Sequence, residues 1–316
     1  MICFNDMTQF ERTLVFMGIV FEQVAILFIF ALIGYLLSHF GVIDSKQSKL
    51  LSVLGVYVFL PCKVIKSFWQ YFNTQYISEK YPFIIVSAII VVCLVIVAHF
   101  LCRLFSKDSY ERNIYNYSLI VPNFGYVGYA LAESLFGGEA LLNMIIFGLP
   151  ISCYTYTEGF RILTGQDRVS LKKMINPMII AVVLGAILGL SGSGMPSIVE
   201  KVLSMGGSCM SPIAMILVGV VVSEFSITRI LSDWRNYVMS GLRLAVIPLI
   251  IVLAMIPFCS REMILSAVLC FAMPCGMNTV VFPKLVGKNC ELGAGLAFVS
   301  GVLSLVTLTF WLNLIR

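Results

Sequence analysis

The sequence predicts an all-helical membrane protein with ten transmembrane helices in two inverted five-helix repeats, and three observations carry this prediction. The chain is 59% hydrophobic and only 12% charged over 316 residues, whereas a soluble domain is about half apolar and about a quarter charged. Ten stretches approach the roughly 20 apolar residues that cross a bilayer. Glycines and prolines also recur between the two halves at a nearly constant offset. The bilayer is therefore the predicted solvent of most of the chain.

The predicted spans follow one another with short connections, which leave no room for a domain outside the membrane. Residues 1–20 form a predicted leader or interfacial segment, 21–161 the first repeat, 162–173 a short central cytoplasmic loop and 174–316 the second repeat. The ten spans are predicted at residues 21–40, 47–68, 82–104, 113–136, 140–161, 174–191, 197–224, 237–258, 262–286 and 290–314.

The repeat prediction depends on three matched positions. Gly34 and Gly185 are 151 residues apart, as are Pro61 and Pro212, and the third pair is separated by 152 residues: Pro122 and Pro274. Five spans in each half is an odd number, so the second half enters the membrane from the opposite side. Inverted repeats of this kind are typical of secondary transporters.

Positive charge predicts the orientation. Of the 21 lysines and arginines, 14 lie in or beside the odd-numbered connections and 7 on the other side with the termini. Because basic loops stay in the cytoplasm, both termini are predicted on the extracytoplasmic side of a plasma or inner membrane. The net charge of +5 is small and scattered, so no nucleic-acid partner is expected.

Catalytic and metal-binding patterns are absent from the sequence. None of the ten cysteines forms a CxxC pair, and His39 and His99 are the two histidines, so metal-ligand spacing is not found. We expect free thiols that behave as small hydrophobes. The sequence predicts no metal, no cofactor and no enzymatic activity.

Spans four and nine contain the predicted substrate site. Each has a proline near its middle with glycine and asparagine close behind, and this combination favours a break in the helix. Broken backbone at membrane depth is tolerated where it lines a cavity, and matched breaks mark the substrate site of inverted-repeat carriers. New helix N-termini at such breaks suit a carboxylate. The predicted site residues are Pro122, Asn123, Gly125, Tyr126, Pro274, Cys275, Gly276, Met277 and Asn278.

Ordinary helix kinks are the alternative reading of these breaks, since proline and glycine are common in membrane helices. Pro61 and Pro212 either line the same cavity or only bend their helices. Lys63 either counters an anionic substrate or reaches the outer interface. The acidic side chains near span ends are expected to reach the interface: Glu133, Glu158 and Glu224.

Several segments together resemble the auxin efflux carrier family. They are VPNFGYVGYALAESLFGGEALLNMIIF, INPMIIAVVLGAILGL, the region from Pro212 through ILVGVVVSEF, GVIDSKQSKLLSVLGVYVFLP and the last fifth of the chain beginning FAMPCGMNTVVFPK. The resemblance implies a five-plus-five carrier whose fourth and ninth helices are broken and cross at proline. It implies small carboxylate substrates, such as auxins in plants and malate- or malonate-like acids in bacterial relatives. Its crossover residues correspond to Pro122, Asn123 and Pro274. The long central loop of the plant carriers is missing, which favours a compact bacterial-type member.

The sequence thus predicts an alternating-access carrier of a small organic anion, with a proton, sodium or no coupling ion and with a homodimer among the possible assemblies. Facilitated or potential-driven efflux fits the lack of an obvious deep acid. The rival predictions are a bile-acid-type sodium symporter, a membrane sensor that binds without transport, and an intramembrane enzyme, whose facing catalytic residues are not found.

Overall fold

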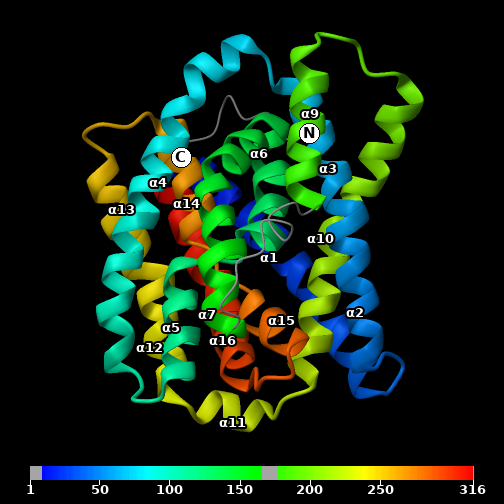
Figure 1. Ribbon diagram of the computed structural model, residues 1–316. Helices are drawn as coiled ribbons and strands as arrows, with labels where there is room; N and C mark the ends of the chain where they lie inside the picture. The colour runs from blue at the N-terminus through cyan, green and yellow to red at the C-terminus, as the bar shows by residue number, and fades with distance from the viewer. Residues whose placement is uncertain (1–8, 166–176, 316) are drawn as a thin grey trace.

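The computed structural model describes residues 9–165 and 177–315 of the chain (Figure 1). Over these residues the protein is helical and has no β-strand, only one isolated antiparallel bridge. Most of the predicted central loop, 162–173, lies outside the described residues. The helices are α1 (Gln9–His39), α2 (Ser45–Leu54), α3 (Leu60–Tyr71), α4 (Thr74–Leu101), α5 (Ser109–Ile120), α6 (Tyr129–Tyr154), α7 (Phe160–Thr164), α9 (Pro177–Leu190), α10 (Ser197–Ser223), α11 (Ile227–Ser232), α12 (Trp234–Gly241), α13 (Ile247–Met255), α14 (Arg261–Phe271), α15 (Asn278–Leu285) and α16 (Glu291–Ile315).

Six helical stretches of the described chain are long and apolar enough to cross a membrane, which makes it a multi-pass membrane protein. They are Phe21–His39, Thr74–Leu104, Leu131–Thr164, Ser197–Ser223, Trp234–Met255 and Glu291–Ile315.

Other predicted spans are interrupted or only partly described. A π-helical turn at Gly55–Phe59 precedes Pro61 between α2 and α3, as expected where proline removes a backbone donor. The predicted span 113–136 breaks between α5 and a π-helical turn at Phe124–Gly128 that leads into α6. The predicted span 262–286 breaks between α14 and α15.

Helix α6 consists of two arms. Gly137 has a φ of 84° inside it, a left-handed conformation that glycine adopts without a side-chain clash. The first arm, residues 124–136, comprises the π-helical turn Phe124–Gly128 and the start of α6, and it runs from the break after α5 to this kink. The second arm, residues 138–154, continues into another π-helical turn and α7.

Side-chain caps begin several helices at the ends of the molecule. Asn73 accepts a hydrogen bond from the backbone N–H of Tyr76 at the start of α4, and Asp108 accepts one from Glu111 at the start of α5. These caps satisfy donors that have no intrahelical partner. Figure 1 places the α1–α2, α4–α5, α10–α11 and α15–α16 connections at its lower end, and the α3–α4, α9–α10 and α13–α14 connections at its upper end.

The helices form two groups. The flanking bundle contains α1, α2, α3, α9 and α10, and the crossing bundle contains α4 to α7 and α12 to α16. Two glycines bring helices of the flanking bundle into close approach. A Cβ on Gly34 of α1 would overlap the backbone of Ile216 in α10, and one on Gly185 of α9 would overlap Phe68 of α3. The two glycines paired in the sequence thus perform the same packing role.

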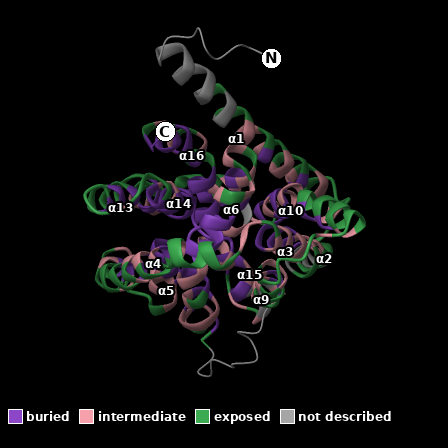
Figure 2. Cartoon of the chain, turned by 90° about the horizontal axis from the view of Figure 1, so that it is seen from above, coloured by how far each residue is buried: buried purple, intermediate pink, exposed green. Residues whose placement is uncertain are grey.

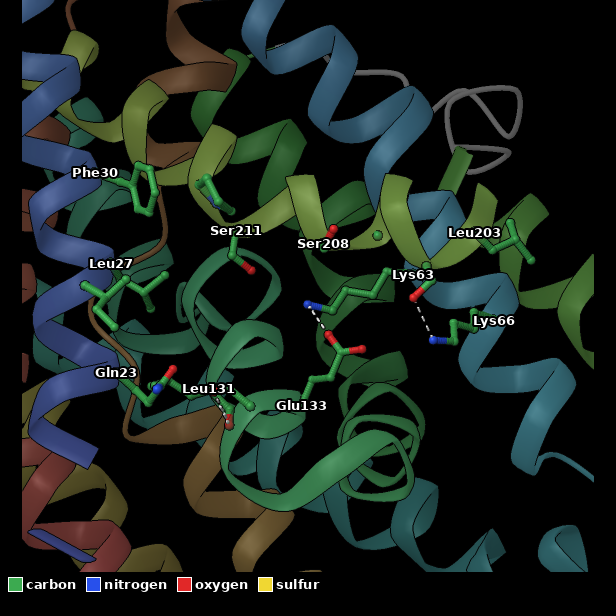
Figure 3. A pocket seen from close by; sticks show the side chains of 15 residues that line it. Gln23, Leu27, Phe30, Lys63, Lys66, Leu131, Glu133, Leu203, Ser208 and Ser211 are labelled. Atoms are coloured by element: carbon green, nitrogen blue, oxygen red, sulfur yellow. Dashed lines mark hydrogen bonds and ion pairs between the residues drawn. The ribbon is translucent and has the colours of Figure 1, made fainter. Parts of the chain in front are cut away.

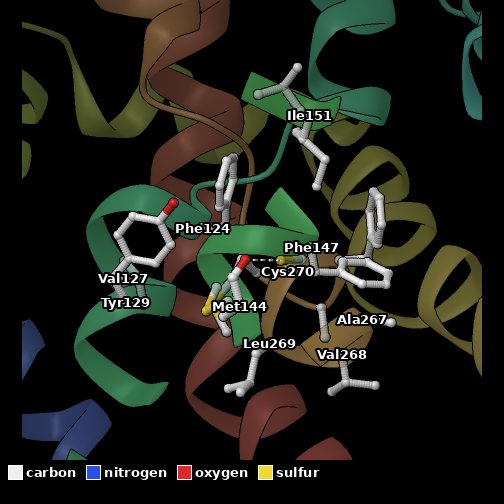
Figure 4. Packing of buried hydrophobic residues seen from close by; sticks show 14 of the residues in the cluster. Phe124, Val127, Tyr129, Met144, Phe147, Ile151, Ala267, Val268, Leu269 and Cys270 are labelled. Atoms are coloured by element: carbon white, nitrogen blue, oxygen red, sulfur yellow. Dashed lines mark hydrogen bonds between the residues drawn. The ribbon is translucent and has the colours of Figure 1, made fainter. Parts of the chain in front are cut away.

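Buried residues gather at the centre, around α6, α14 and α16, when the molecule is seen from above (Figure 2). Figure 4 shows part of this core, where Phe124, Tyr129 and Met144 pack beside Phe147 and Cys270. The outward face of α4, in contrast, exposes a row of large apolar side chains: Ile85, Ile89, Val92 and Ile96. A face of this kind is stable against lipid and would be unfavourable in water.

Candidate functional site

The two helix breaks meet at the centre of the crossing bundle. The N–H of Asn123 donates to the carbonyl of Pro274 at 2.8 Å, and the N–H of Gly276 donates to the carbonyl of Val121 at 3.2 Å. Pro122 and Cys275 form the antiparallel bridge between them. Each extended segment therefore satisfies backbone groups of the other, which is required of broken helices in an apolar surrounding.

Glycine is required at this crossing. A Cβ on Gly276 would lie 2.9 Å from the Val121 carbonyl oxygen, closer than normal contact. A side chain there would push the two segments apart and weaken both hydrogen bonds between them. The backbone shape predicted for the proline and glycine residues is thus found at the crossing of two segments about 150 residues apart in the sequence.

The crossing encloses a small cavity of about 50 Å³. That volume holds a few water molecules. Six of the predicted site residues line it: Pro122, Asn123, Gly125, Gly276, Met277 and Asn278. Tyr129, Ser152, Thr155 and Tyr156 also line it and were not predicted from the sequence.

Three of the predicted site residues are not found among the described residues of the cavity wall: Pro274, Cys275 and Tyr126. Pro274 borders a neighbouring chamber instead of this cavity. Cys275 is buried at the bridge, where its backbone N–H donates to Ser300 Oγ at 2.9 Å, and it is not among the residues that line the cavity. Tyr126 lies on the π-helical turn after the crossing, and its side chain lies outside what the structure describes.

Polar side chains around the cavity differ in how they are satisfied. The Asn278 amide donates to the Tyr117 hydroxyl at 3.0 Å. Asn123 is 6% exposed, and its side chain makes no capping hydrogen bond to the turn that it precedes. The Tyr129 hydroxyl is buried and has no partner among the described residues. Since buried polar groups are normally paired, Asn123 and Tyr129 are groups available to a ligand.

Helix polarity adds to this chemistry. The turn after Asn123 and helix α15 after Met277 both begin at the crossing. The first N–H groups of a helix have no intrahelical acceptor, and they carry a partial positive charge that attracts anions. A carboxylate at the cavity would therefore meet two helix N-termini and amide and hydroxyl donors.

Arg243 stabilises the opposite polarity. Arg243 lies on the π-helical turn that connects α12 to α13, and its side chain is fully buried. Nη1 donates to the carbonyl of Leu119 at 3.0 Å, and Nε donates to that of Met273 at 3.3 Å. The Leu119 carbonyl lies in the last turn of α5, and the Met273 carbonyl lies two residues past the end of α14. The C-terminal end of each helix carries roughly half a unit of negative charge. One guanidinium thus balances two helix ends. This role of Arg243 was not predicted from the sequence, although a basic residue inside an apolar stretch was a usable signal.

An apolar chamber of about 270 Å³ adjoins the crossing between α1, α10 and α16. Asn123, Pro274 and Met277 form its inner wall, and Phe28, Met215 and Phe298 contribute apolar surface. The chamber lies between the flanking and crossing bundles. It could hold the apolar part of a molecule whose polar group reaches Asn123.

A larger cavity, about 400 Å³, separates α3 and α10 from the first arm of α6 (Figure 3). Lys63 and Glu133 form an ion pair across it with Nζ and Oε2 2.8 Å apart. Glu133 therefore contacts a lysine of another helix, whereas the sequence predicted an interfacial position. Pro212 also lines this cavity, but Pro61 does not and lies after the π-helical turn at the start of α3.

Metal ligation is not supported within residues 9–165 and 177–315. These residues contain no group of three or more histidine, cysteine, aspartate or glutamate side chains that could hold an ion. Another cavity, at the far end of the crossing bundle, is lined by charged side chains. Among them, Arg235 forms ion pairs with Glu111 and with Asp233. The hydrogen bonds from Arg235 outweigh burial and hold the pKa of the Asp233 carboxyl below its usual range.

Comparisons with known proteins cover most of the chain. A family model described as membrane transport protein matches twice, over residues 19–168 and 165–312. An uncharacterized transporter of Methanocaldococcus jannaschii is 25% identical in an alignment of 310 residues that covers 92% of this chain and 97% of that protein. An uncharacterized transporter of Methanothermobacter thermautotrophicus is 25% identical in an alignment of 311 residues that covers 94% of this chain and 99% of that protein.

Proposed function

Because the chain belongs to the membrane transport protein family, the auxin efflux carrier family that its motifs predicted, we propose that it is a secondary carrier of a small organic anion. The substrate class is a mono- or dicarboxylate or an auxin-like acid. Transport would proceed by alternating access, with the crossing bundle moving against the flanking bundle. The bilayer and the substrate anion are its proposed partners.

One observation carries this proposal. Two broken helices cross with their N-termini facing one cavity. The unpaired Tyr129 hydroxyl lines this cavity, as does Asn123, whose side chain makes no capping hydrogen bond. Such a site binds negative charge although the described residues of the cavity wall include no lysine or arginine. Weak, distributed donors allow a carboxylate to bind and also to leave, as a carrier requires.

The proposed architecture has ten spans in two inverted repeats: 21–161 and 174–316, joined by the loop 162–173 and preceded by the leader 1–20. The two successive family matches support two repeats. The connections found at alternating ends of the molecule support ten passes (Figure 1). The lower end bears Arg103, Lys107 and Arg229 in its connections, so we propose that it faces the cytoplasm and that both termini face outward.

Flux measurement tests the proposal. Purified protein reconstituted into liposomes should take up labelled malonate, which is a small dicarboxylate. Asn123→Ala and Asn278→Ala should each weaken malonate binding by about tenfold, the loss expected for one hydrogen bond to a charged group, without loss of expression. Flux equal to that of empty liposomes for malonate, acetate and indole-3-acetate would refute the proposal. Imposed proton or sodium gradients identify the coupling ion, and cross-linking in the membrane tests the proposed homodimer.

The apolar chamber beside Asn123 favours a second candidate, a bile-acid-type sodium symporter. A large amphipathic acid could place its carboxylate at the crossing and its apolar body in the chamber. Strict sodium dependence, together with uptake of taurocholate and no uptake of malonate, would favour this candidate over the first.

A further inference from the structure

The ion pair between Lys63 and Glu133 joins the two bundles beside a cavity that is lined by both polar and apolar side chains. Lys63 is on α3 of the flanking bundle, and Glu133 is on the first arm of α6 in the crossing bundle. The Lys63 side chain is 4% exposed, whereas that of Glu133 is 41% exposed. The lysine therefore depends on a counter-ion, because a buried unpaired charge is strongly unfavourable, while the carboxylate can be solvated elsewhere.

The cavity around this pair is suited to anions. Lys66, one helical turn after Lys63, donates to Ser204 Oγ at 3.1 Å. Ser208 and Ser211 of α10 line the same space (Figure 3). Two lysines and several hydroxyl groups thus face about 400 Å³, and Glu133 is the single acidic residue among the described lining residues.

The cavity is close to the crossing. Leu60 and Met210 line the crossing cavity, and Lys63 and Ser211 on the same two helices line the larger one. One helical turn therefore separates the two spaces along α3. The first arm of α6 also connects them, since it begins after Asn123 and carries Glu133 ten residues later, about 15 Å along a helix.

We propose that this cavity is an anion-binding vestibule in which a substrate carboxylate replaces Glu133 as the partner of Lys63. The inference rests on the proposed carrier function and adds an entry or exit site to it. When the substrate displaces Glu133, the first arm is released from the flanking bundle. The same exchange that admits the anion thus frees the arm that begins at the crossing.

Removing the competing carboxylate gives this inference a distinctive test. Malonate affinity of the purified full chain in detergent is measured by isothermal titration. Glu133→Gln should bind malonate about fivefold more tightly, the effect expected from a half-exposed ion pair. Lys63→Met should bind about tenfold more weakly or worse, and adding Glu133→Gln to it should restore nothing. If the glutamine variant does not fold, Glu133→Ala removes the same competitor.

A matched control is available within the crossing bundle. Lys80 and Glu262 also form an ion pair of a mostly buried lysine with a half-exposed glutamate, but both belong to the crossing bundle and neither lines the vestibule. Glu262→Gln should leave malonate affinity unchanged. A purely structural role for Lys63 and Glu133 predicts weaker binding or lower stability in Glu133→Gln, never tighter binding.

The outcomes separate this inference from the carrier function. Malonate flux by the wild type with unchanged or weaker affinity in Glu133→Gln overturns the vestibule and leaves the carrier. No carboxylate binding or flux in any variant overturns both.

Discussion

Arg243 should be the residue whose conservative replacement costs the protein most. Its guanidinium donates to two carbonyls at once, at the ends of α5 and α14. A lysine ammonium would keep the charge, but it is a point donor and cannot reproduce the planar fork. Arg243→Lys therefore loses one hydrogen bond from a charged group, about 1.5–3 kcal/mol, and still buries the charge.

Arg243→Met separates charge from geometry. Methionine leaves both carbonyls without their donor, which costs about 1–3 kcal/mol each. It also removes the several kcal/mol needed to desolvate the guanidinium, so the net change in stability is smaller than the sum of the lost bonds. Malonate transport should nevertheless fall, because no cation then bridges the two helix ends.

The assay is equilibrium unfolding in mixed micelles alongside liposome flux, with Arg235→Lys as the control. Arg235 lies on α12 one helix earlier, is 29% exposed and pairs with Asp233 and Glu111. A partly solvated pair is worth about 1 kcal/mol or less, so Arg235→Lys should change the free energy of unfolding little. If Arg243→Lys costs no more than this control, the assigned bridging role is wrong.

Three further predictions concern the crossing. Tyr129→Phe should reduce malonate affinity about tenfold in titrations. Tyr115→Phe removes another buried unpaired hydroxyl, which lies away from the cavity, and should leave the affinity unchanged. Equal effects of the two variants would contradict the ligand role of Tyr129. Gly276→Ala should abolish flux and lower stability, since its Cβ would meet the opposing carbonyl. Gly125→Ala, where a Cβ has open space, should be tolerated. Wild-type flux in Gly276→Ala would argue against the tight crossing. Asn123→Asp should weaken malonate binding more than Asn123→Ala, because it adds a like charge at the anion site; titration of both decides, and equal losses would remove electrostatics from the site.

The helical class and the positions of the two helix breaks could be predicted from the sequence because both depend on local properties, whereas their crossing was implied by the family resemblance. Apolar length defines membrane helices. Proline lacks a backbone donor, so Pro122 and Pro274 indicated where helices break. Pro122 and Pro274 are separated by nearly the same number of residues as the other two matched pairs, which indicated that the two breaks occupy corresponding positions in the two halves. The structure joins these segments through backbone hydrogen bonds.

Residues whose roles depend on distant partners could not be predicted. Glu133 looked interfacial because its position within its own helix says nothing about Lys63, which lies 70 residues earlier and on another bundle. Tyr129 looked like one more aromatic residue in an apolar helix. The positions of Cys275 and Pro61 were predicted as part of a pattern, but their orientation depends on which face of the backbone turns to the cavity.

Two cations that are buried among the described residues, Lys63 and Arg243, make bonds of different kinds: the Lys63 pair is exchangeable and the Arg243 bonds are permanent. Arg243 is fully buried, contacts backbone carbonyls and joins elements of one bundle, so no rearrangement of side chains can replace its partners. Lys63 contacts a side chain that is 41% exposed and belongs to the other bundle, so a different carboxylate can take that position. In the proposed alternating access, motion between the bundles would require breaking the Lys63 pair and preserving the Arg243 bonds. It follows that variants at Lys63 should change affinity and rate, whereas variants at Arg243 should change whether the crossing forms.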